Sequence, residues 1–129
     1  MAEMSDTNLW IEFVFEGDLI LRGFINRIYA PLIVEEIKFR LPLEGKTALM
    51  AGEMKITLGI SKGNAKPTND VKKADIAYQP LGDSLDIYLS DKRTYSQVNV
   101  IGRITSDETK LDALVQVRRG SSVTIRLAE

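Results

Sequence analysis

Histidine and cysteine, the side chains that most often carry out catalysis, are both missing from this chain. Without histidine, no side chain ordinarily exchanges protons near neutral pH. Without cysteine, the chain has no thiolate nucleophile, no disulfide and no Cys-type zinc site. A serine nucleophile would need a lysine or a carboxylate as its base, and neither a P-loop nor a Gly-x-Gly-x-x-Gly motif occurs. We therefore expect no catalytic residue, no metal site and no cofactor.

Closely spaced carboxylates and lysines are the remaining groups that could do chemistry. We interpret Asp83 and Asp86 as turn residues, and Glu35 and Glu36 as residues on the exposed side of a helix. The four lysines of segment 61–73 are interpreted as part of a solvated loop. None of these groups is expected to form a site.

Length and composition indicate one ordinary soluble domain. The 129 residues are 44% hydrophobic and 27% charged, values typical of a globular protein that buries a continuous core. The net charge of −1 argues against a nucleic acid or an anionic membrane as the main partner. The N-terminus is polar and acidic, unlike a signal peptide. We expect a cytoplasmic domain over residues 1–129, with residues 1–8 as a flexible tail.

The elements that would position a site are short alternating strands. Residues 9–22 predict a hairpin around Gly17, and residues 46–60 predict two strands that are broken at Ala51 and Gly52. Between them, Pro31 begins a helix over 31–40 whose apolar side chains repeat every fourth residue.

The second half of the chain continues this pattern. Residues 61–73 have no periodicity and predict a long loop. Two strands follow around the turn at 81–84, and residues 98–104 predict another, with Ile101 expected to point away from the core. A capped helix over 107–116 leads to a last strand. About eight strands and two helices predict a mainly β fold, a closed or nearly closed antiparallel barrel that is capped by the helices.

Two segments resemble a known family. The strand Val98-Asn99-Val100-Ile101-Gly102-Arg103-Ile104, followed by a capped helix and Gly120, resembles the C-terminal third of the cyclophilin-like barrel. The segment Ala74-Asp75-Ile76-Ala77-Tyr78-Gln79-Pro80-Leu81-Gly82-Asp83-Ser84-Leu85 is similar to a motif of small archaeal and bacterial cyclophilin-like proteins of unassigned function. The similarity covers roughly residues 9–127, and Gln79 stands where that family usually has tryptophan.

The motifs of true cyclophilins are absent. Their Phe-His-Arg and Gln-Gly-Gly-Asp motifs, which supply the arginine and its neighbours that polarise a prolyl amide, do not occur in this chain. The resemblance therefore implies a non-catalytic binding module for a peptide or a small molecule. The alternatives are a weak or specialised peptidyl-prolyl isomerase and a module for self-association or protein interaction. The oligomeric state stays open.

The resemblance also implies a place for the binding site. Tyr78 and Tyr95 flank the turns with which a cyclophilin-like barrel builds its groove, and tyrosine offers both a ring and a hydroxyl to a partner. Their neighbours in the sequence and Glu53, which follows Gly52 in a family-like motif, complete the expected site. The expected binding residues are Glu53, Tyr78, Gln79, Tyr95, Gln97 and Asn99.

Overall fold

The structure is a computed structural model that describes residues 8–128. Its elements in chain order are β1 (Asn8–Phe15), β2 (Leu19–Asn26), α2 (Pro31–Arg40), β3 (Leu43–Met50), β4 (Glu53–Thr57), β5 (Thr68–Val71), β6 (Asp75–Gln79), β7 (Ser84–Tyr88), β8 (Lys92–Ile104), α3 (Glu108–Asp112), the 3-10 helix η1 (Ala113–Gln116) and β9 (Ser122–Leu127). The predicted tail is wrong at Asn8, which begins β1, and the rest of that prediction lies outside the described residues.

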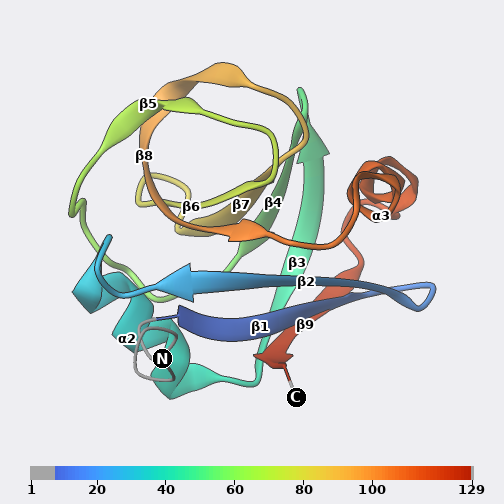
Figure 1. Cartoon of the computed structure of the whole chain (residues 1–129), viewed down its shortest axis with the longest axis horizontal. Coiled ribbons are helices and arrows are strands. Elements are labelled where there is room, and N and C mark those ends of the chain that lie inside the picture. Colours follow the sequence, from blue (N-terminus) through green and yellow to red (C-terminus); the bar gives the residue numbers. More distant parts are fainter. Residues whose placement is uncertain (1–7, 129) are drawn as a thin grey trace.

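Eight of the described strands form a closed antiparallel ring. Their order is β2-β1-β9-β3-β4-β7-β6-β8, and pairing between β2 and β8 joins the two ends. The ninth strand, β5, pairs with the first part of β8, and α2 and α3 lie near opposite ends of β2 (Figure 1). The predicted mainly β fold with two helices is confirmed. Within residues 8–128, neither helix is long and apolar enough to cross a bilayer.

The core fills the inside of the ring because one side of each strand is apolar. Ile11, Phe13 and Phe15 of β1 are buried, as are Val123 and Ile125 of the neighbouring β9. Both helices close this core. Their buried members are Ile33, Val34 and Ile37 of α2, Leu111 of α3 and Leu114 of η1. The apolar spacing in the sequence predicts buried positions at Ile33, Ile37, Leu111 and Leu114, which is confirmed, and also at Val115, which is wrong because its side chain is exposed.

Two glycines allow β2 and β8 to approach closely where the ring closes. A Cβ at Gly102 would collide with the carbonyl oxygen of Phe24, and a Cβ at Gly23 would collide with the carbonyl oxygen of Arg103. Backbone atoms form both obstacles, so a side chain could not be accommodated by a change of rotamer. The absence of these two side chains therefore helps to close the ring.

The prediction for β8 needs two corrections. The strand is longer than residues 98–104 because it begins at Lys92 and its first part pairs with β5, a strand within the predicted loop 61–73. Ile101 is fully buried in the core instead of pointing outward. The register shifts opposite it, between Ile76 and Ala77 of β6, and such an irregularity breaks the two-residue alternation.

Candidate functional site

A buried polar network lies on the side of β4 and β7 that faces away from the ring core. Asp86 of β7 is fully buried, and its side chain accepts hydrogen bonds from Ser84 Oγ at 2.7 Å and from Lys55 Nζ at 3.2 Å. The hydroxyl of Tyr88 lies 3.4 Å from the same carboxylate. The strand pairing of β4 with β7 places Lys55 directly opposite Asp86. A charge is thus held in the protein interior by a cation on the next strand.

Glu53 extends this network toward the surface by bridging two ammonium groups. Lys55 Nζ lies 2.8 Å from Glu53 Oε2, and Lys92 Nζ lies 3.1 Å from Glu53 Oε1. Lys92 also donates to the carbonyl oxygen of Ala51 at 2.8 Å, and Lys55 donates to Gln79 Oε1 at 3.0 Å. The two carboxylates and the two ammonium groups balance in charge when all four are ionised.

The network shifts the pKa values of its members. Burial raises the pKa of Asp86 to about 6, although the charge of Lys55 opposes the shift. Burial also disfavours the charge of Glu53, but hydrogen bonds from Lys55 and Lys92 outweigh it and lower the pKa of Glu53. For Lys55 the hydrogen bond to Glu53 and the charge of Asp86 outweigh burial, so its pKa is raised. Lys55 therefore stays an ammonium ion at neutral pH and is a poor nucleophile.

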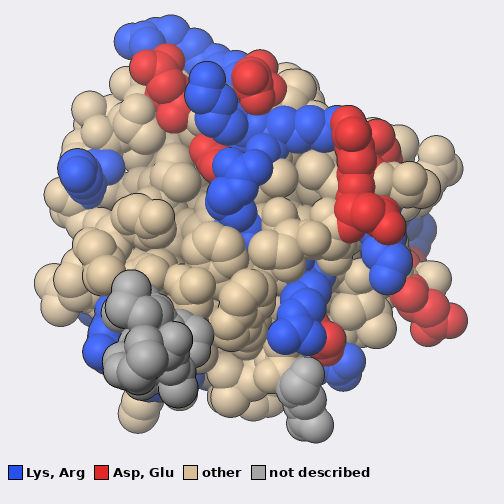
Figure 2. All heavy atoms as spheres, in the orientation of Figure 1, with Lys and Arg blue, Asp and Glu red and all other residues tan. Residues whose placement is uncertain are grey.

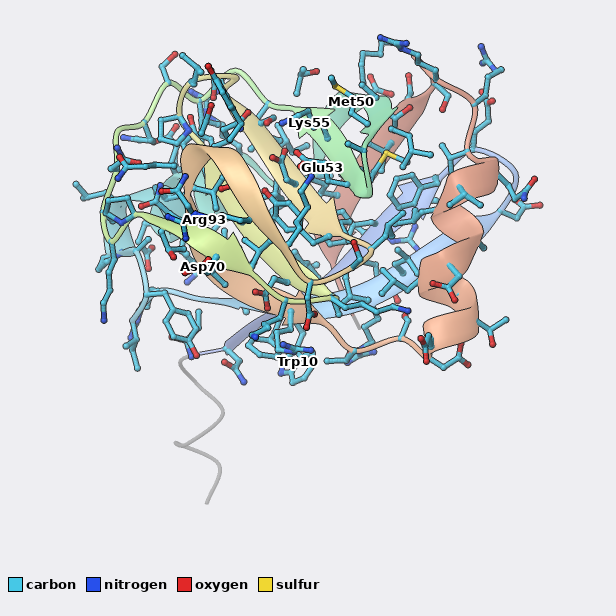
Figure 3. All side chains as sticks on the ribbon, turned by 90° about the horizontal axis from the view of Figure 1, so that it is seen from above. Trp10, Met50, Glu53, Lys55, Asp70 and Arg93 are labelled. Carbon is cyan, nitrogen blue, oxygen red and sulfur yellow. The ribbon has the colours of Figure 1, made fainter. Side chains whose placement is uncertain are left out.

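A cavity of about 350 Å³ opens above this network, and we call it the network pocket. Its size lies in the range of small-molecule sites. Met50, Glu53 and Lys55 lie close together on β3 and β4 in Figure 3. The pocket is lined by Met50, Ala51, Glu53, Lys55, Gln79, Lys92, Thr94, Tyr95 and Ser96.

Several polar atoms of the network pocket keep unused hydrogen-bonding capacity. Lys92 uses two of its three N–H bonds, on Ala51 and Glu53. Gln79 accepts from Lys55 through its oxygen and keeps the two N–H donors of its NH₂ group. Within residues 8–128, the hydrogen bond of Gln79 uses its side-chain oxygen and that of Ser96 uses its carbonyl oxygen. The NH₂ group of Gln79 and the hydroxyl of Ser96 therefore have no hydrogen-bond partner in this part of the chain. The pocket therefore presents donors beside a carboxylate.

The structure brings three of the six expected site residues together. Glu53, Gln79 and Tyr95 line the network pocket, and Tyr95 is fully exposed at its rim. They come from β4, β6 and β8; in the sheet β6 pairs with β8, and β7 lies between β6 and β4. Whether they bind a ligand stays a prediction.

Tyr78 does not share this cavity, so its expected place is wrong. The side chain is fully buried and packs in the ring core. Its hydroxyl donates to Asp83 Oδ1 at 2.6 Å and accepts from the backbone N–H of Lys62 at 3.1 Å. Burial and the Asp83 carboxylate raise the pKa of Tyr78 to about 12. Tyr78 fastens the loop after β4 to the turn between β6 and β7.

Asn99 and Gln97 also lie away from the network pocket. Asn99 is buried, and its side-chain oxygen accepts from the backbone N–H groups of Ala65 and Lys66 at 2.8 and 3.0 Å. It therefore holds the loop before β5. Gln97 lines a separate cavity of about 210 Å³ together with Asn64, Pro80, Leu81 and Ser96.

Sequence reasoning missed Lys55, Lys92 and Asp86. Asp83 is a turn residue as predicted, because it lies in the turn between β6 and β7; its carboxylate also accepts from the backbone N–H groups of Ile60 and Ser61. For Asp86 the same interpretation is wrong, because Asp86 lies within β7. The sequence signal for a buried charge at this position is a carboxylate between Leu85 and Ile87, which are both buried. A charged residue at the middle of so apolar a strand needs a buried partner.

The chain also contains a short motif that is typical of hydrolases. Residues 59–63 match the pattern Gly-x-Ser-x-Gly, with Ser61 at its centre. In hydrolases this motif lies on a sharp turn between a strand and a helix, whereas here it lies in the loop between β4 and β5. The hydroxyl of Ser61 is exposed and lies 3.4 Å from Asp83. The motif therefore lacks the structural context of a nucleophile. Among residues 8–128, no group of three or more acidic side chains could hold a metal ion.

Comparison with solved structures finds the same fold elsewhere. A hypothetical protein from Archaeoglobus fulgidus, whose structure was determined in solution, is 23% identical, with a TM-score of 0.75 over 95% of this chain and 96% of that one. The structure of McbB in complex with tryptophan is 14% identical, with a TM-score of 0.70 over 91% of this chain. The match spans 44% of the McbB chain. Both likenesses show the fold.

No curated protein sequence matches the chain. A family model described as Cyclophilin-like matches residues 9–126, which span nearly all of the described ring. The match includes β4, β6 and β8, the strands that build the network pocket. The predicted resemblance is confirmed, and the chain belongs to the cyclophilin-like family.

Proposed function

We propose that this protein binds a small zwitterion of the α-amino acid class in the network pocket, without chemical conversion. The observation that supports this proposal most directly is the position of Glu53 between two ammonium groups. A carboxylate and spare N–H and O–H donors stand in one partly buried cavity, and such a site is complementary to a ligand that carries both charges.

The two halves of the ligand would have separate partners. The ligand's ammonium group would donate to Glu53, whose oxygens each accept one hydrogen bond from a lysine and keep capacity for another. The ligand's carboxylate would accept from the third N–H of Lys92, the NH₂ group of Gln79 and the hydroxyl of Ser96. Tyr95 and Met50 would offer apolar contact to the ligand's side chain.

Two further observations favour this ligand class. The pocket volume of about 350 Å³ suits a single amino acid better than a long peptide. McbB, of whose chain 44% matches this fold, was solved in complex with tryptophan, which is an α-amino acid. The raised pKa of Lys55 favours binding over covalent chemistry, because an ammonium ion offers charge and no lone pair.

Titration calorimetry with phenylalanine and two blocked analogues tests the proposal. Phenylalanine is expected to bind, and both N-acetylphenylalanine, which lacks the ammonium, and phenylalaninamide, which lacks the carboxylate, should bind at least about tenfold more weakly. Equal binding of all three would contradict recognition of a zwitterion. Absence of binding by each of the twenty common amino acids would overturn the proposal.

A variant pair assigns the binding to the network pocket. Glu53→Gln removes the carboxylate and should weaken phenylalanine binding at least about tenfold, because the ligand's ammonium loses its ionic partner. Glu35→Gln, on the exposed side of α2, is the matched control and should leave the affinity unchanged. Thermal unfolding of both variants verifies that each is folded. Unchanged affinity in folded Glu53→Gln would place the ligand elsewhere.

A further inference from the structure

A second cavity lies on another part of the molecule. It has a volume of about 380 Å³ and opens between β2, the turn before α2, the start of β5 and the last part of β8. We call it the apolar pocket. It shares no lining residue with the network pocket, and its lining comprises Phe24, Tyr29, Lys66, Pro67, Thr68, Asp75, Val100, Gly102 and Arg103.

The walls of this pocket are aromatic and aliphatic. Phe24, Tyr29, Pro67 and Val100 are among the residues that line it. The ring of Trp10, on the adjacent strand, packs edge-on against Phe24 with 5.5 Å between ring centroids. Phe24 is therefore held in place from behind, and a flat ring could lie against it and Tyr29. In the space-filling view, the left part of the face over β2 and β8 is largely uncharged (Figure 2).

The charges at the rim leave one uncompensated cation. Arg103 lies 3.2 Å from Asp75, and Asp75 also accepts from the backbone N–H of Lys72 at 2.9 Å, so these two side chains neutralise each other. Within residues 8–128, the hydrogen bond of Lys66 involves its backbone N–H, and its ammonium group has no ion pair or hydrogen bond. Of its five N–H bonds, Arg103 uses one on Asp75 and one on the carbonyl oxygen of Lys73.

We propose that the apolar pocket binds a small aromatic carboxylate. The ligand's ring would lie against Phe24 and Tyr29, and its carboxylate would be held by Lys66 and by free N–H bonds of Arg103. Two features of the pocket select this class. The apolar walls disfavour a strongly hydrated ligand, and the excess positive charge disfavours an aromatic amine. This site is separate from the one in which we place the zwitterion, and neither proposal depends on the other.

Fluorescence of Trp10 provides a direct measurement, because it is the only tryptophan of the chain and touches a wall of the pocket. Phenylacetate is the probe, with phenylacetamide and phenethylamine as its neutral and cationic counterparts. Phenylacetate should change the emission of the full chain saturably, and the two counterparts should bind at least about fivefold more weakly. Equal affinity of phenylacetate and phenylacetamide, or no saturable change, would overturn the proposal.

Variants of Lys66 test the ionic contact. Lys66→Met should weaken phenylacetate binding about fivefold or more, and Lys66→Arg should restore it, since only the charge is required. Lys110→Met, which removes an exposed lysine of α3, is the matched control and should bind as the wild type does. Equal binding by Lys66→Met and wild type would contradict the assignment of the carboxylate to Lys66.

Amide chemical shifts separate this proposal from the proposed function. With phenylacetate, the backbone amides of Thr68, Val100 and Arg103 should move, and those of Lys55 and Thr94 should stay. Movement confined to Lys55 and Thr94 would show that the carboxylate enters the network pocket and would overturn the proposal for the apolar pocket. Glu53→Gln assigns phenylalanine binding to the network pocket and Lys66→Met assigns phenylacetate binding to the apolar pocket, so either proposal can fail alone.

Discussion

At the scale of single residues, the network pocket depends on one buried ion pair. Asp86 is fully buried and its only cationic partner within residues 8–128 is Lys55, at 3.2 Å. Removing one member of such a pair is strongly destabilising, because it leaves the other charge buried and unpaired. Lys55 in turn holds Glu53 at 2.8 Å. The ligand carboxylate and ammonium that we propose would therefore meet polar groups whose positions are already set.

The raised pKa of Asp86 predicts an unusual pH dependence of stability. Its carboxyl loses a proton near 3.8 in the unfolded chain and near 6 in the folded protein, so between these values the folded state binds more protons. The contribution of Asp86 to the free energy of unfolding is therefore greatest below pH 4 and is lost as the pH rises through 6. At 1.36 kcal/mol for each pKa unit, the loss amounts to about 3 kcal/mol.

Comparison of the wild type with Asp86→Asn isolates this contribution. The difference in the free energy of unfolding, wild type minus variant, should fall by up to about 3 kcal/mol between pH 4 and pH 7 in urea titrations. Asp70→Asn is the control, because Asp70 is largely exposed in its pair with Arg93, and its difference should stay within about 0.5 kcal/mol. A difference for Asp86→Asn that rises over the same range would contradict the raised pKa.

At the scale of elements, alternating sequence patterns predicted most strands but not their irregularities. The hairpin of β1 and β2 and the break at Ala51 and Gly52 follow directly from local sequence. The register shift opposite Ile101 does not, because it depends on how β6 pairs with β8. Likewise, β5 has no apolar pattern of its own and is formed by pairing with β8. The register of β6 and the formation of β5 therefore depend on pairing with β8, which the local sequence pattern does not predict.

The contact between β2 and β8 gives a prediction at this scale. Gly102→Ala should lower the free energy of unfolding by about 2 kcal/mol or more, since the new Cβ would meet the carbonyl oxygen of Phe24. Gly63→Ala is the matched control, because a Cβ there has open space, and it should change stability by less than about 0.5 kcal/mol. Equal stability of the two variants in urea titrations would show that the strands can separate without cost.

At the scale of the whole molecule, family membership establishes the fold and leaves the site to be argued from its residues. Sequence analysis predicted that Glu53, Gln79 and Tyr95 belong to one site, and the three residues line the same cavity. It could not reveal Lys92, which reaches Glu53 from a strand 39 residues further along the chain. Tyr78 was expected at the surface because its type suits a groove, but its position in β6 turns it into the core.

Prolyl isomerase activity should be very low, because the chain lacks the catalytic motifs of true cyclophilins. The Phe-His-Arg and Gln-Gly-Gly-Asp motifs, which supply the arginine and its neighbours in true cyclophilins, do not occur in this chain, and the network pocket contains no arginine. An isomerisation assay on a proline-containing peptide, with an ordinary cyclophilin assayed in parallel, measures this. A catalytic efficiency within tenfold of that cyclophilin would contradict a purely binding role.

The central claim is that the network pocket receives a zwitterion, and the most direct measurement is a two-dimensional ¹H–¹⁵N NMR titration of the full chain with phenylalanine. The account predicts saturable shifts of the backbone amides of Glu53, Lys55 and Gln79 and of the first part of β8, which contribute to the pocket. Amides of β1 and β9 should not move. Shifts confined to β1 and β9, or no shift at saturating phenylalanine, would contradict it.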